Sequence, residues 1–442
     1  MIEGIKKMDV YKVKTIAEPP NLQVSVPGSK SITNRALLMA AMAEGMTILR
    51  GVQFSEDSLH FLTALQDLGF AVTVDQQCCQ VMIRGYGGRI PRNEATIYVG
   101  SAGTAARFLT AFVAMSPGRY RLNASEQMKK RPMRELLVAL EEIGARFTWL
   151  GDPYAFPMEV QGMGRRHGEY RIQLNIDRSS QFLSALLMTS PLMLDSLVIE
   201  LTGTRSARSY VNMTEQMMRQ FGHPGVQKYG EDCYQVKRSS YHAQEYTVEP
   251  DVSAACYFYA IAAVTGGTAI VQHMCRDSLQ GDMKFLEVLE QMGCTLRWIP
   301  GDGQTERLEL VGPQNGTLHG IDIKMSDFSD QALTLAAIAP YADAPVTIRG
   351  VSHIRRQESD RLQVIVTELE RIGIHCDMLS DGVVIHPGQP HGARIQTYQD
   401  HRVAMSFAIT GLRTEGIEIA DPMCCRKTFA QYFELFEKGL YS

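Results

Sequence analysis

The chain has 442 residues, 45% of them hydrophobic, and its 48 Asp and Glu outnumber its 44 Lys and Arg, which gives a formal net charge of −4. A single hydrophobic core stops growing near about 250–300 residues, so this length predicts two domains. The acidic balance excludes the basic excess typical of nucleic-acid-binding proteins and favours small-molecule partners.

The cysteines and the N-terminus indicate where the protein works. Nine cysteines include no CxxC pair and no His/Cys cluster at zinc-ligand spacing. A reduced cytoplasmic protein without a structural metal fits this usage. Residues 1–15 lack the apolar core of a signal peptide, and no apolar run approaches the ~20 residues that cross a bilayer. We therefore expect a cytoplasmic protein that binds neither membranes nor nucleic acid.

The stretch 28–51 predicts a polar loop, a buried helix and a strand. Small polar and basic residues lead into the apolar run Ala36–Ala43, which breaks at Gly45 before β-branched residues. A second helix, Leu59–Leu68, has leucine at every third position and stops at Gly69, a helix-ending signal.

The same plan recurs six times along the chain. The apolar helices, each preceded by Ser, Asp, Asn or Thr, are expected at Ala36–Ala43, Phe108–Ala114, Phe182–Met188, Tyr257–Val264, Leu333–Ala339 and Val403–Ile409. The second helices are expected to stop at Gly69, Gly144, Gly222, Gly293, Gly373 and Gly439. These stops lie 66 to 80 residues apart. That period is too long for a solenoid and suits a βαβα unit closed by two strands.

Six repeats divide evenly into two domains of three. Tyr11–Val26 predicts a short strand, a turn and a strand entering the first repeat, and 246–251 is an extended segment before the fourth. Domain 1 is therefore expected to combine 1–28 with 248–442, and domain 2 to cover 29–247. No Pro/Ser-rich linker separates them, which indicates a tight hinge.

Cations gather where the apolar helices begin. Helix N-termini attract anions, so converging openings would form an anion site. Lys30, Ser31 and Arg35 stand at the first opening, where a nucleotide phosphate loop is disfavoured because the GxxxxGK[ST] spacing is absent. A solvated helix cap is the alternative. Gly103 lies in a small-residue turn that is either structural or a close approach to ligand.

Further openings supply more polar groups. Ser179, Ser180 and Gln181 offer hydroxyls and an amide, although N-capping by Ser180, a frequent role of serine, is the favoured explanation from this stretch alone. Charges are dense at 355–361, which is either a solvated face or a substrate contact, and Asp400-His401-Arg402 precedes the last apolar helix. A surplus of cations at helix openings in an acidic chain predicts a small, polyanionic substrate.

Nine ordered motifs resemble one family, 3-phosphoshikimate 1-carboxyvinyltransferase or EPSP synthase, from about Val24 to Phe436. They are GSKSITNRALLMAA, GSAGTAAR, KKRPM, SSQFLSALLM, EPDVSAACYF, SDQALTLAA, ESDRL, DHRVAMSFAI and DPMCCRKTF. The resemblance implies an α/β, two-domain enolpyruvyl transferase fold. Each domain is built from three βαβαββ units, with the N-terminal strands in the C-terminal domain and the active site in the interdomain cleft.

The resemblance also implies the reaction. The enolpyruvyl group of phosphoenolpyruvate is transferred to the 5-hydroxyl of shikimate 3-phosphate, through a tetrahedral addition–elimination intermediate, with release of phosphate. The resemblance implies these two anionic substrates as partners and no cofactor or metal at the site, and we expect a monomer. Asp330 matches the residue at the hydroxyl, Glu358 the one at the methylene carbon, and Lys30 assists proton transfer.

The binding residues follow from the same motifs. Those expected to bind shikimate 3-phosphate are Lys30, Ser31, Arg35, Ser179, Ser180, Gln181, Asp330, His353 and Gln357. Those expected to bind phosphoenolpyruvate are Lys30, Gly103, Arg131, Gln181, Arg361, Arg402 and Lys427.

Four positions depart from the family pattern. Ser101 replaces an Asn in the turn before Gly103, and Ala207 stands where many members have a serine that helps to hold the substrate phosphate. His353 and Gln357 replace an Asn and a Lys that contact shikimate 3-phosphate. The departures thus fall mainly on the acceptor side.

Three alternatives stay open on the sequence. The sister transferase acting on UDP-N-acetylglucosamine usually carries a reactive cysteine in a loop that here, at 119–131, contains none. A transferase with another phosphorylated cyclic alcohol as acceptor would fit the acceptor-side changes. A non-catalytic anion-binding relative would be expected to lose proton-transfer residues, whereas Lys30, Asp330 and Glu358 are present.

Overall fold

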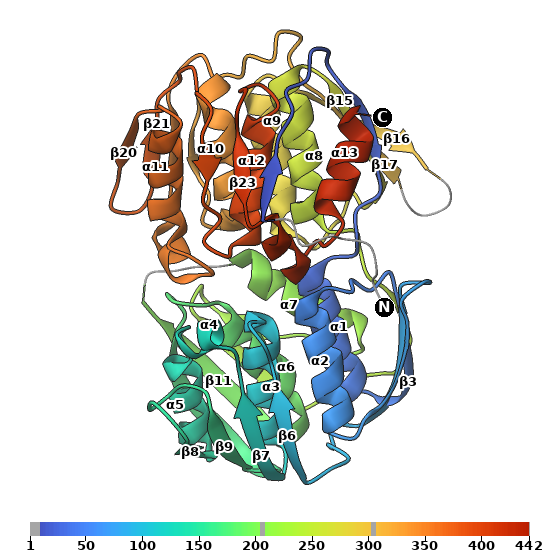
Figure 1. Cartoon of the computed structure of the whole chain (residues 1–442). Coiled ribbons are helices and arrows are strands. Elements are labelled where there is room, and N and C mark those ends of the chain that lie inside the picture. The colour runs from blue at the N-terminus through green and yellow to red at the C-terminus, as the bar shows by residue number, and fades with distance from the viewer. Residues whose placement is uncertain (1–8, 204–207, 302–305, 442) are drawn as a thin grey trace. The chain divides into compact units, whose positions relative to one another are not determined.

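The computed structural model describes residues 9–203, 208–301 and 306–441. The chain divides into two compact units. Unit 1 combines residues 1–27 with 249–442, and unit 2 is formed by residues 28–248. In Figure 1 unit 1 contains the red C-terminal helices together with the blue strand β1, and unit 2 runs from blue to green.

Unit 2 contains repeats one to three. Repeat one consists of β14 (Glu245–Thr247), α1 (Lys30–Met42), β3 (Glu44–Arg50), α2 (Glu56–Asp67), β4 (Ala71–Asp75) and β5 (Gln80–Tyr86). Repeat two consists of β6 (Glu94–Tyr98), α3 (Gly103–Met115), β7 (Gly118–Asn123), α4 (Glu126–Lys129), α5 (Arg134–Ile143), β8 (Arg146–Trp149) and β9 (Met158–Gly162). Repeat three consists of β10 (Arg166–Asn175), α6 (Gln181–Met193), β11 (Leu194–Thr202), α7 (Arg208–Gln220), β12 (Gln227–Tyr229) and β13 (Cys233–Lys237).

Unit 1 contains repeats four to six, with short 3-10 turns (η) at several helix openings. Repeat four consists of β2 (Asn21–Val24), α8 (Val252–Thr265), β15 (Thr268–Met274), η1 (Gly281–Met283), α9 (Lys284–Gln291), β16 (Thr295–Pro300) and β17 (Glu306–Val311). Repeat five consists of β18 (Asp322–Lys324), η2 (Ser329–Gln331), α10 (Ala332–Ile338), η3 (Ala339–Tyr341), β19 (Val346–Arg349), η4 (Ser352–Arg356), α11 (Arg361–Arg371), β20 (Cys376–Met378) and β21 (Val383–Ile385). Repeat six consists of β22 (Arg394–Ile395), α12 (His401–Thr410), β23 (Glu418–Ala420), η5 (Pro422–Lys427), α13 (Tyr432–Tyr441) and β1 (Val10–Lys12).

Every repeat builds its own small sheet on one plan. In repeat two the order is β6-β7-β9-β8, with β6 parallel to β7 and β9 antiparallel to both of its neighbours. The four other four-stranded sheets of the described residues follow the same order and directions. In repeat six the N-terminal strand β1 pairs antiparallel with β23 and takes the place of the closing hairpin. The predicted βαβαββ unit is therefore confirmed.

The strand that opens a repeat does not always precede it in the chain. Strand β2 pairs parallel with β15, which places it in repeat four, and β14 pairs parallel with β3, which places it in repeat one. The expectation from strand spacing that Tyr11–Val26 enters the first repeat is thus wrong. Backbone hydrogen bonds join these strands to their sheets, and such bonds do not depend on the order of the strands along the chain.

The apolar helices form the centre of each unit. Every residue of α3 is buried, and α3 packs against α6 and α1 in unit 2. In unit 1, α8 packs against α10 and α12. A helix that is apolar on all sides belongs inside the core, with sheets and the second helices around it. None of the helices in the described ranges is long and apolar enough to span a membrane.

Glycine ends five of the second helices as predicted. The residues with left-handed backbone at these stops are Gly69, Gly144, Gly222, Gly293 and Gly373, with φ between +85° and +120°. Gly439 is the exception, because α13 continues through it to Tyr441. A Cβ at Gly439 would lie 3.0 Å from Leu22 Cδ2, so close packing and not a turn accounts for this glycine.

Candidate active site

The three central helices of unit 2 begin beside one another. Asn34 Nδ2 in the first turns of α1 donates to Thr104 Oγ1 of α3 at 2.5 Å. Arg107 of α3 donates from Nη1 to Gln181 Oε1, at the first residue of α6, at 2.7 Å. These contacts bring the helix openings into one cluster, where unpaired backbone N–H groups favour anions.

Lys30 is the first residue of α1. Its Nζ lies 3.4 Å from Asp57 Oδ2, and Asp57 is buried in the first turn of α2. Ser29 caps the helix by accepting from the Ile32 amide. The buried carboxylate therefore holds the ammonium group at the opening of α1, next to the hydroxyl-bearing Ser31.

Gly103 lies against two guanidinium groups. A Cβ built there would be 2.7 Å from Arg107 Nη1 and 2.9 Å from both terminal nitrogens of Arg131. Arg131 also donates from Nη1 to the Ser101 carbonyl at 3.4 Å. The missing side chain thus leaves room for these cations at the first turn of α3.

The serines at the opening of α6 have different local roles. Ser180 holds the N-cap position, but its side chain makes no capping hydrogen bond. Ser179 Oγ accepts from the Gln181 amide at 3.3 Å. The simple explanation of Ser180 as a helix cap is therefore wrong, and both serines stand at an opening where anions are favoured.

Arg35 is enclosed between helices. Its guanidinium donates to Thr214 Oγ1 at 2.8 Å, to the Ser31 carbonyl at 3.0 Å and to Ser184 Oγ at 3.3 Å, and lies over the Phe108 ring. Burial lowers the pKa of Arg35 to about 10. Arg35 remains charged at neutral pH and ties α1, α6 and α7 together behind the opening, while its expected contact with substrate stays a prediction.

In unit 1, Arg361 is the centre of the second cluster. Its guanidinium lies 2.8 Å from Asp400, 3.0 Å from Glu358 and 3.1 Å from Asp330. It also donates to the Gln357 amide oxygen. Burial alone would lower the pKa of Arg361, but the carboxylates, led by Asp400, raise it above its ordinary value. One buried cation therefore fixes the geometry of three carboxylates.

Arg402, at the opening of α12, completes this cluster. Its Nη2 lies 2.8 Å from Asp330 Oδ2, so Asp330 bridges Arg402 and Arg361. Arg402 also donates to Tyr257 OH and to Ser253 Oγ on α8, at 3.3 and 3.4 Å. The openings of α8, α10, α11 and α12 thus meet here.

Glu358 also stands between two cations. Its Oε1 lies 3.7 Å from Lys427 Nζ, and its Oε2 is bound by Arg361. Lys427 is buried at the end of η5, and no residue that the structure describes forms a hydrogen bond with its Nζ. This leaves donor capacity on a buried ammonium for an acceptor from outside the chain.

His353 and Gln357, the two residues of unit 1 that depart from the family pattern, both contact side chains of the unit 1 cluster. His353 Nε2 lies 2.8 Å from Ser329 Oγ, next to Asp330 in the chain. The amide oxygen of Gln357 accepts from Arg361. The other departure, Ala207, and its neighbour Ser206 lie outside the described residues.

Sequence reasoning placed Asp400 at a helix opening without assigning it to the site, and it missed Asp282, although both acids belong to the unit 1 cluster. Asp400 is fully buried, accepts from Arg361 and Ser359, and caps α12 at the Arg402 amide. Asp282 is buried before α9, where it accepts from Ser253 Oγ and Gln331 Nε2. The available signal was the repeat itself, because Asp57 and Asp282 both stand where a second helix begins.

Asp282 should make stability depend on pH. Burial and the nearby Asp330 raise the pKa of Asp282 to about 6, although Arg402 opposes this. A carboxyl with a raised pKa in the folded state binds its proton more tightly there, so its contribution to stability falls as pH rises from about 4 to about 6. We therefore compare the free energy of unfolding of Asp282→Asn with that of the parent at two pH values. The difference, variant minus parent, should rise by about 2 kcal/mol from pH 4.5 to pH 7.5.

Urea denaturation at the two pH values measures this difference. Asp277→Asn, at an exposed position, is the matched control and should shift little. If the free energies of unfolding of Asp282→Asn and the parent differ by the same amount at both pH values, the raised pKa of Asp282 is contradicted.

Solved structures of similar shape define the class of protein. The chain superposes on EPSP synthase from Acinetobacter baumannii with a TM-score of 0.82 and 25% identity, covering 98% of this chain and 99% of that one. It superposes on the enolpyruvyl transferase NikO from Streptomyces tendae with a TM-score of 0.74, covering 97% of both chains. At 15% identity the latter shows the fold alone. The fold is therefore that of the enolpyruvyl transferases.

Sequence comparisons identify the family within this class. The profile of EPSP synthase (3-phosphoshikimate 1-carboxyvinyltransferase) matches residues 16–436. A 3-phosphoshikimate 1-carboxyvinyltransferase of Nostoc punctiforme is 45% identical over 97% of this chain and 99% of its own length. One of Yersinia pseudotuberculosis is 39% identical over 95% and 96%. The chain belongs to the EPSP synthase family.

The chain is accordingly a transferase of the shikimate pathway, which leads to chorismate and the aromatic amino acids. It transfers the enolpyruvyl group of phosphoenolpyruvate to shikimate 3-phosphate.

Proposed function

We propose that the two clusters, one in each compact unit, act on the same pair of substrates. The unit 2 cluster supplies Lys30, Ser31, Arg35, Ser179, Ser180 and Gln181 for shikimate 3-phosphate, and Gly103 and Arg131 for phosphoenolpyruvate. The unit 1 cluster supplies Asp330, His353 and Gln357 for shikimate 3-phosphate, and Arg361, Arg402 and Lys427 for phosphoenolpyruvate. The observation that carries the assignment is the pairing of Asp330 and Glu358 with buried cations.

These pairings suit an addition–elimination reaction. Asp330 accepts the proton of the 5-hydroxyl, helped by Lys30, while the hydroxyl oxygen bonds to C2 of phosphoenolpyruvate. Glu358 donates a proton to the methylene carbon, which becomes the methyl group of the tetrahedral intermediate. Elimination then returns a methyl proton to Glu358 as the C–O bond to phosphate breaks, and Asp330 gives its proton to the departing phosphate. Each carboxyl thus alternates between acid and base.

The cations bind anions as well as positioning these acids. Arg361, Arg402 and Lys427 face Asp330, Glu358 and Asp400, so three positive charges meet three negative ones. A phosphate or carboxylate arriving near Lys427 draws this ammonium away from Glu358. A nearby negative charge favours the protonated form of Glu358, which is the form that donates to the methylene carbon.

A phosphate-release assay tests the assignment of the acceptor. With phosphoenolpyruvate present, we expect release with shikimate 3-phosphate and none with UDP-N-acetylglucosamine. Release with the nucleotide sugar alone would replace the acceptor, and release with neither would refute the proposed roles.

Gly103→Ala should weaken phosphoenolpyruvate binding. The added Cβ would come within 2.9 Å of Arg131 and closer still to Arg107, so the flexible guanidinium of Arg131 must move. Losing one charged hydrogen bond costs about 1.5–3 kcal/mol, which predicts a KM for phosphoenolpyruvate raised about tenfold or more.

Steady-state kinetics of Gly103→Ala should be compared with Gly151→Ala. At Gly151 a Cβ meets only ordinary contacts, the nearest at 3.4 Å from Pro157 Cδ. An unchanged KM in Gly103→Ala would separate Gly103 from the phosphoenolpyruvate site. Because Gly103 has no left-handed backbone, any loss of stability in the variant would come from the displaced guanidinium groups and not from backbone strain.

We also propose that the protein acts as a monomer in the cytoplasm. The reduced cysteine usage supports the compartment, since all nine cysteines are free thiols. Light scattering coupled to size exclusion tests the oligomeric state, and a mass of twice 49.3 kDa would overturn it.

A further inference from the structure

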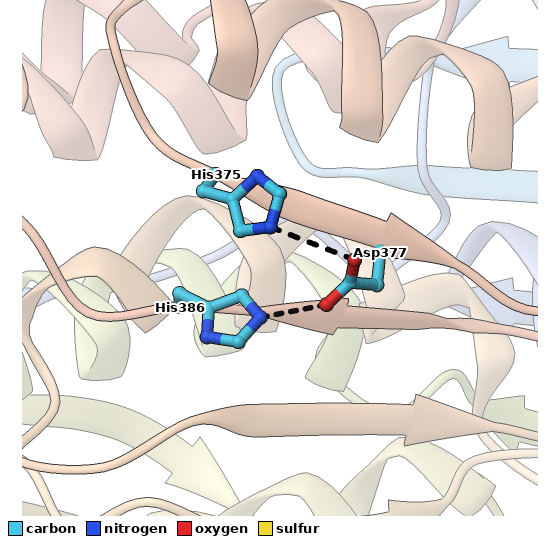
Figure 2. Close-up of side chains that lie close together, drawn as sticks. All are labelled: His375, Asp377 and His386. Carbon is cyan, nitrogen blue, oxygen red and sulfur yellow. Dashed lines mark hydrogen bonds and ion pairs between the residues drawn. The ribbon is translucent and has the colours of Figure 1, made fainter.

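Two histidines and an aspartate meet on one face of a hairpin at the edge of the repeat five sheet. Strand β20 is the edge strand and pairs antiparallel with β21. His375 and Asp377 are two residues apart, so they point to the same face, and His386 lies opposite His375 across the pair. Figure 2 shows both imidazole rings turned toward the carboxylate.

The distances place three potential ligand atoms together. His386 Nε2 lies 2.7 Å from Asp377 Oδ2, and His375 Nε2 lies 3.5 Å from Asp377 Oδ1. One ligand atom from each residue lies within 4.8 Å of the other two. In a tetrahedral zinc site, bonds of about 2.0–2.1 Å put ligand atoms about 3.3 Å apart. Small side-chain rotations therefore convert this cluster into a three-ligand site.

We propose that His375, Asp377 and His386 bind a divalent transition ion such as Zn²⁺. Two imidazoles and a carboxylate are ligands that Zn²⁺ accepts, and water completes the coordination because the three side chains are 36% to 71% exposed. Among the described residues, these three are the group of His, Cys, Asp or Glu side chains whose ligand atoms lie close enough together to hold a metal ion. Sequence spacing did not reveal it, since cross-strand pairing brings His386 to His375.

The neighbouring thiol takes no part in this site. Cys376 is buried, and its side chain faces the side of the strand opposite to Asp377. The site therefore uses nitrogen and oxygen ligands only.

The ion would act on the edge of the sheet and not on the reaction. Arg361 begins α11, and the cluster follows its end at Arg371. Eleven residues at about 1.5 Å each put about 16 Å of helix between Arg361 and the start of this hairpin. Binding joins two strands that otherwise share only a short ladder, so we expect it to raise thermal stability and leave turnover unchanged.

Calorimetric titration of chelator-treated protein with Zn²⁺ tests the site. A Cys78→Ser, Cys79→Ser background removes an adjacent pair of exposed thiols that would compete for the ion. We expect one equivalent of Zn²⁺ to bind, with affinity at least tenfold weaker in His386→Ala and in Asp377→Asn. His391→Ala, which removes an exposed imidazole outside the cluster, should bind like the parent.

Two further readouts decide between a site and a pair of hydrogen-bonded histidines. With Co²⁺ in place of Zn²⁺, the parent should give a d–d absorption spectrum without thiolate charge transfer, and Asp377→Asn should lose it. Zn²⁺ should raise the melting temperature of the parent and of His391→Ala but not of His386→Ala. Equal binding and equal melting shifts in all of these proteins would overturn the proposal. If His386→Ala does not fold, His375→Gln provides the same comparison from the other strand.

Discussion

Glu358→Gln should lower turnover by roughly 10²-fold or more, the lower range for the loss of a general acid–base group. The amide keeps the shape of the side chain and its place beside Arg361 and Lys427. Unlike the carboxyl group, however, it can neither donate a proton to the methylene carbon nor accept one from the methyl group. Phosphoenolpyruvate should still bind, because the two cations remain. Steady-state turnover and calorimetric binding of phosphoenolpyruvate measure the two effects separately.

Glu370→Gln is the matched control for this substitution. Glu370 lies near the far end of α11, twelve residues beyond Glu358 in the chain, and is exposed to solvent, so its amide variant should keep full activity. Turnover of Glu358→Gln within a factor of two of the parent would remove Glu358 from the mechanism. Weakened phosphoenolpyruvate binding with normal turnover at saturation would instead make Glu358 a binding residue.

Arg361→Met should destabilise unit 1 strongly. The guanidinium is 2% exposed and contacts Asp400, which is completely buried, along with Glu358 and Asp330. Methionine would leave these carboxylates without their common cation. Removing one partner of a buried ion pair typically costs about 3–5 kcal/mol, because the charge left behind is neither hydrated nor paired. Urea denaturation should show a loss of this size.

Arg349→Met is the control that distinguishes the effect of losing a buried ion pair from that of losing an exposed one. Arg349 and Asp322 form a pair in which both side chains are about half exposed, so its loss should cost about 0–1 kcal/mol. If Arg361→Met is no less stable than Arg349→Met, the buried network does not depend on Arg361. Arg361→Lys, which restores the charge without the forked geometry, should recover only part of the stability.

Most of the secondary structure followed from local signals. The six apolar helices and five glycine stops are properties of neighbouring residues, and they were predicted from spacing and residue type. The prediction failed at Gly439, because a glycine required by contact with Leu22 looks the same in sequence as one required by a turn. The family and its reaction were also predicted, because nine motifs in fixed order carry that information.

The sequence by itself determined the repeat, the fold class and the residue types gathered at helix openings, since these depend on periodicity and local backbone preference. Only the tertiary structure decided which openings share contacts. Strands β2 and β14 pair outside their sequential repeats, and Arg361 collects carboxylates from three helix openings. His386 reaches Asp377 through strand register. Contacts between distant segments cannot be recognised from neighbouring residues in the sequence. They depend on backbone hydrogen bonds and charges that many sequences could supply.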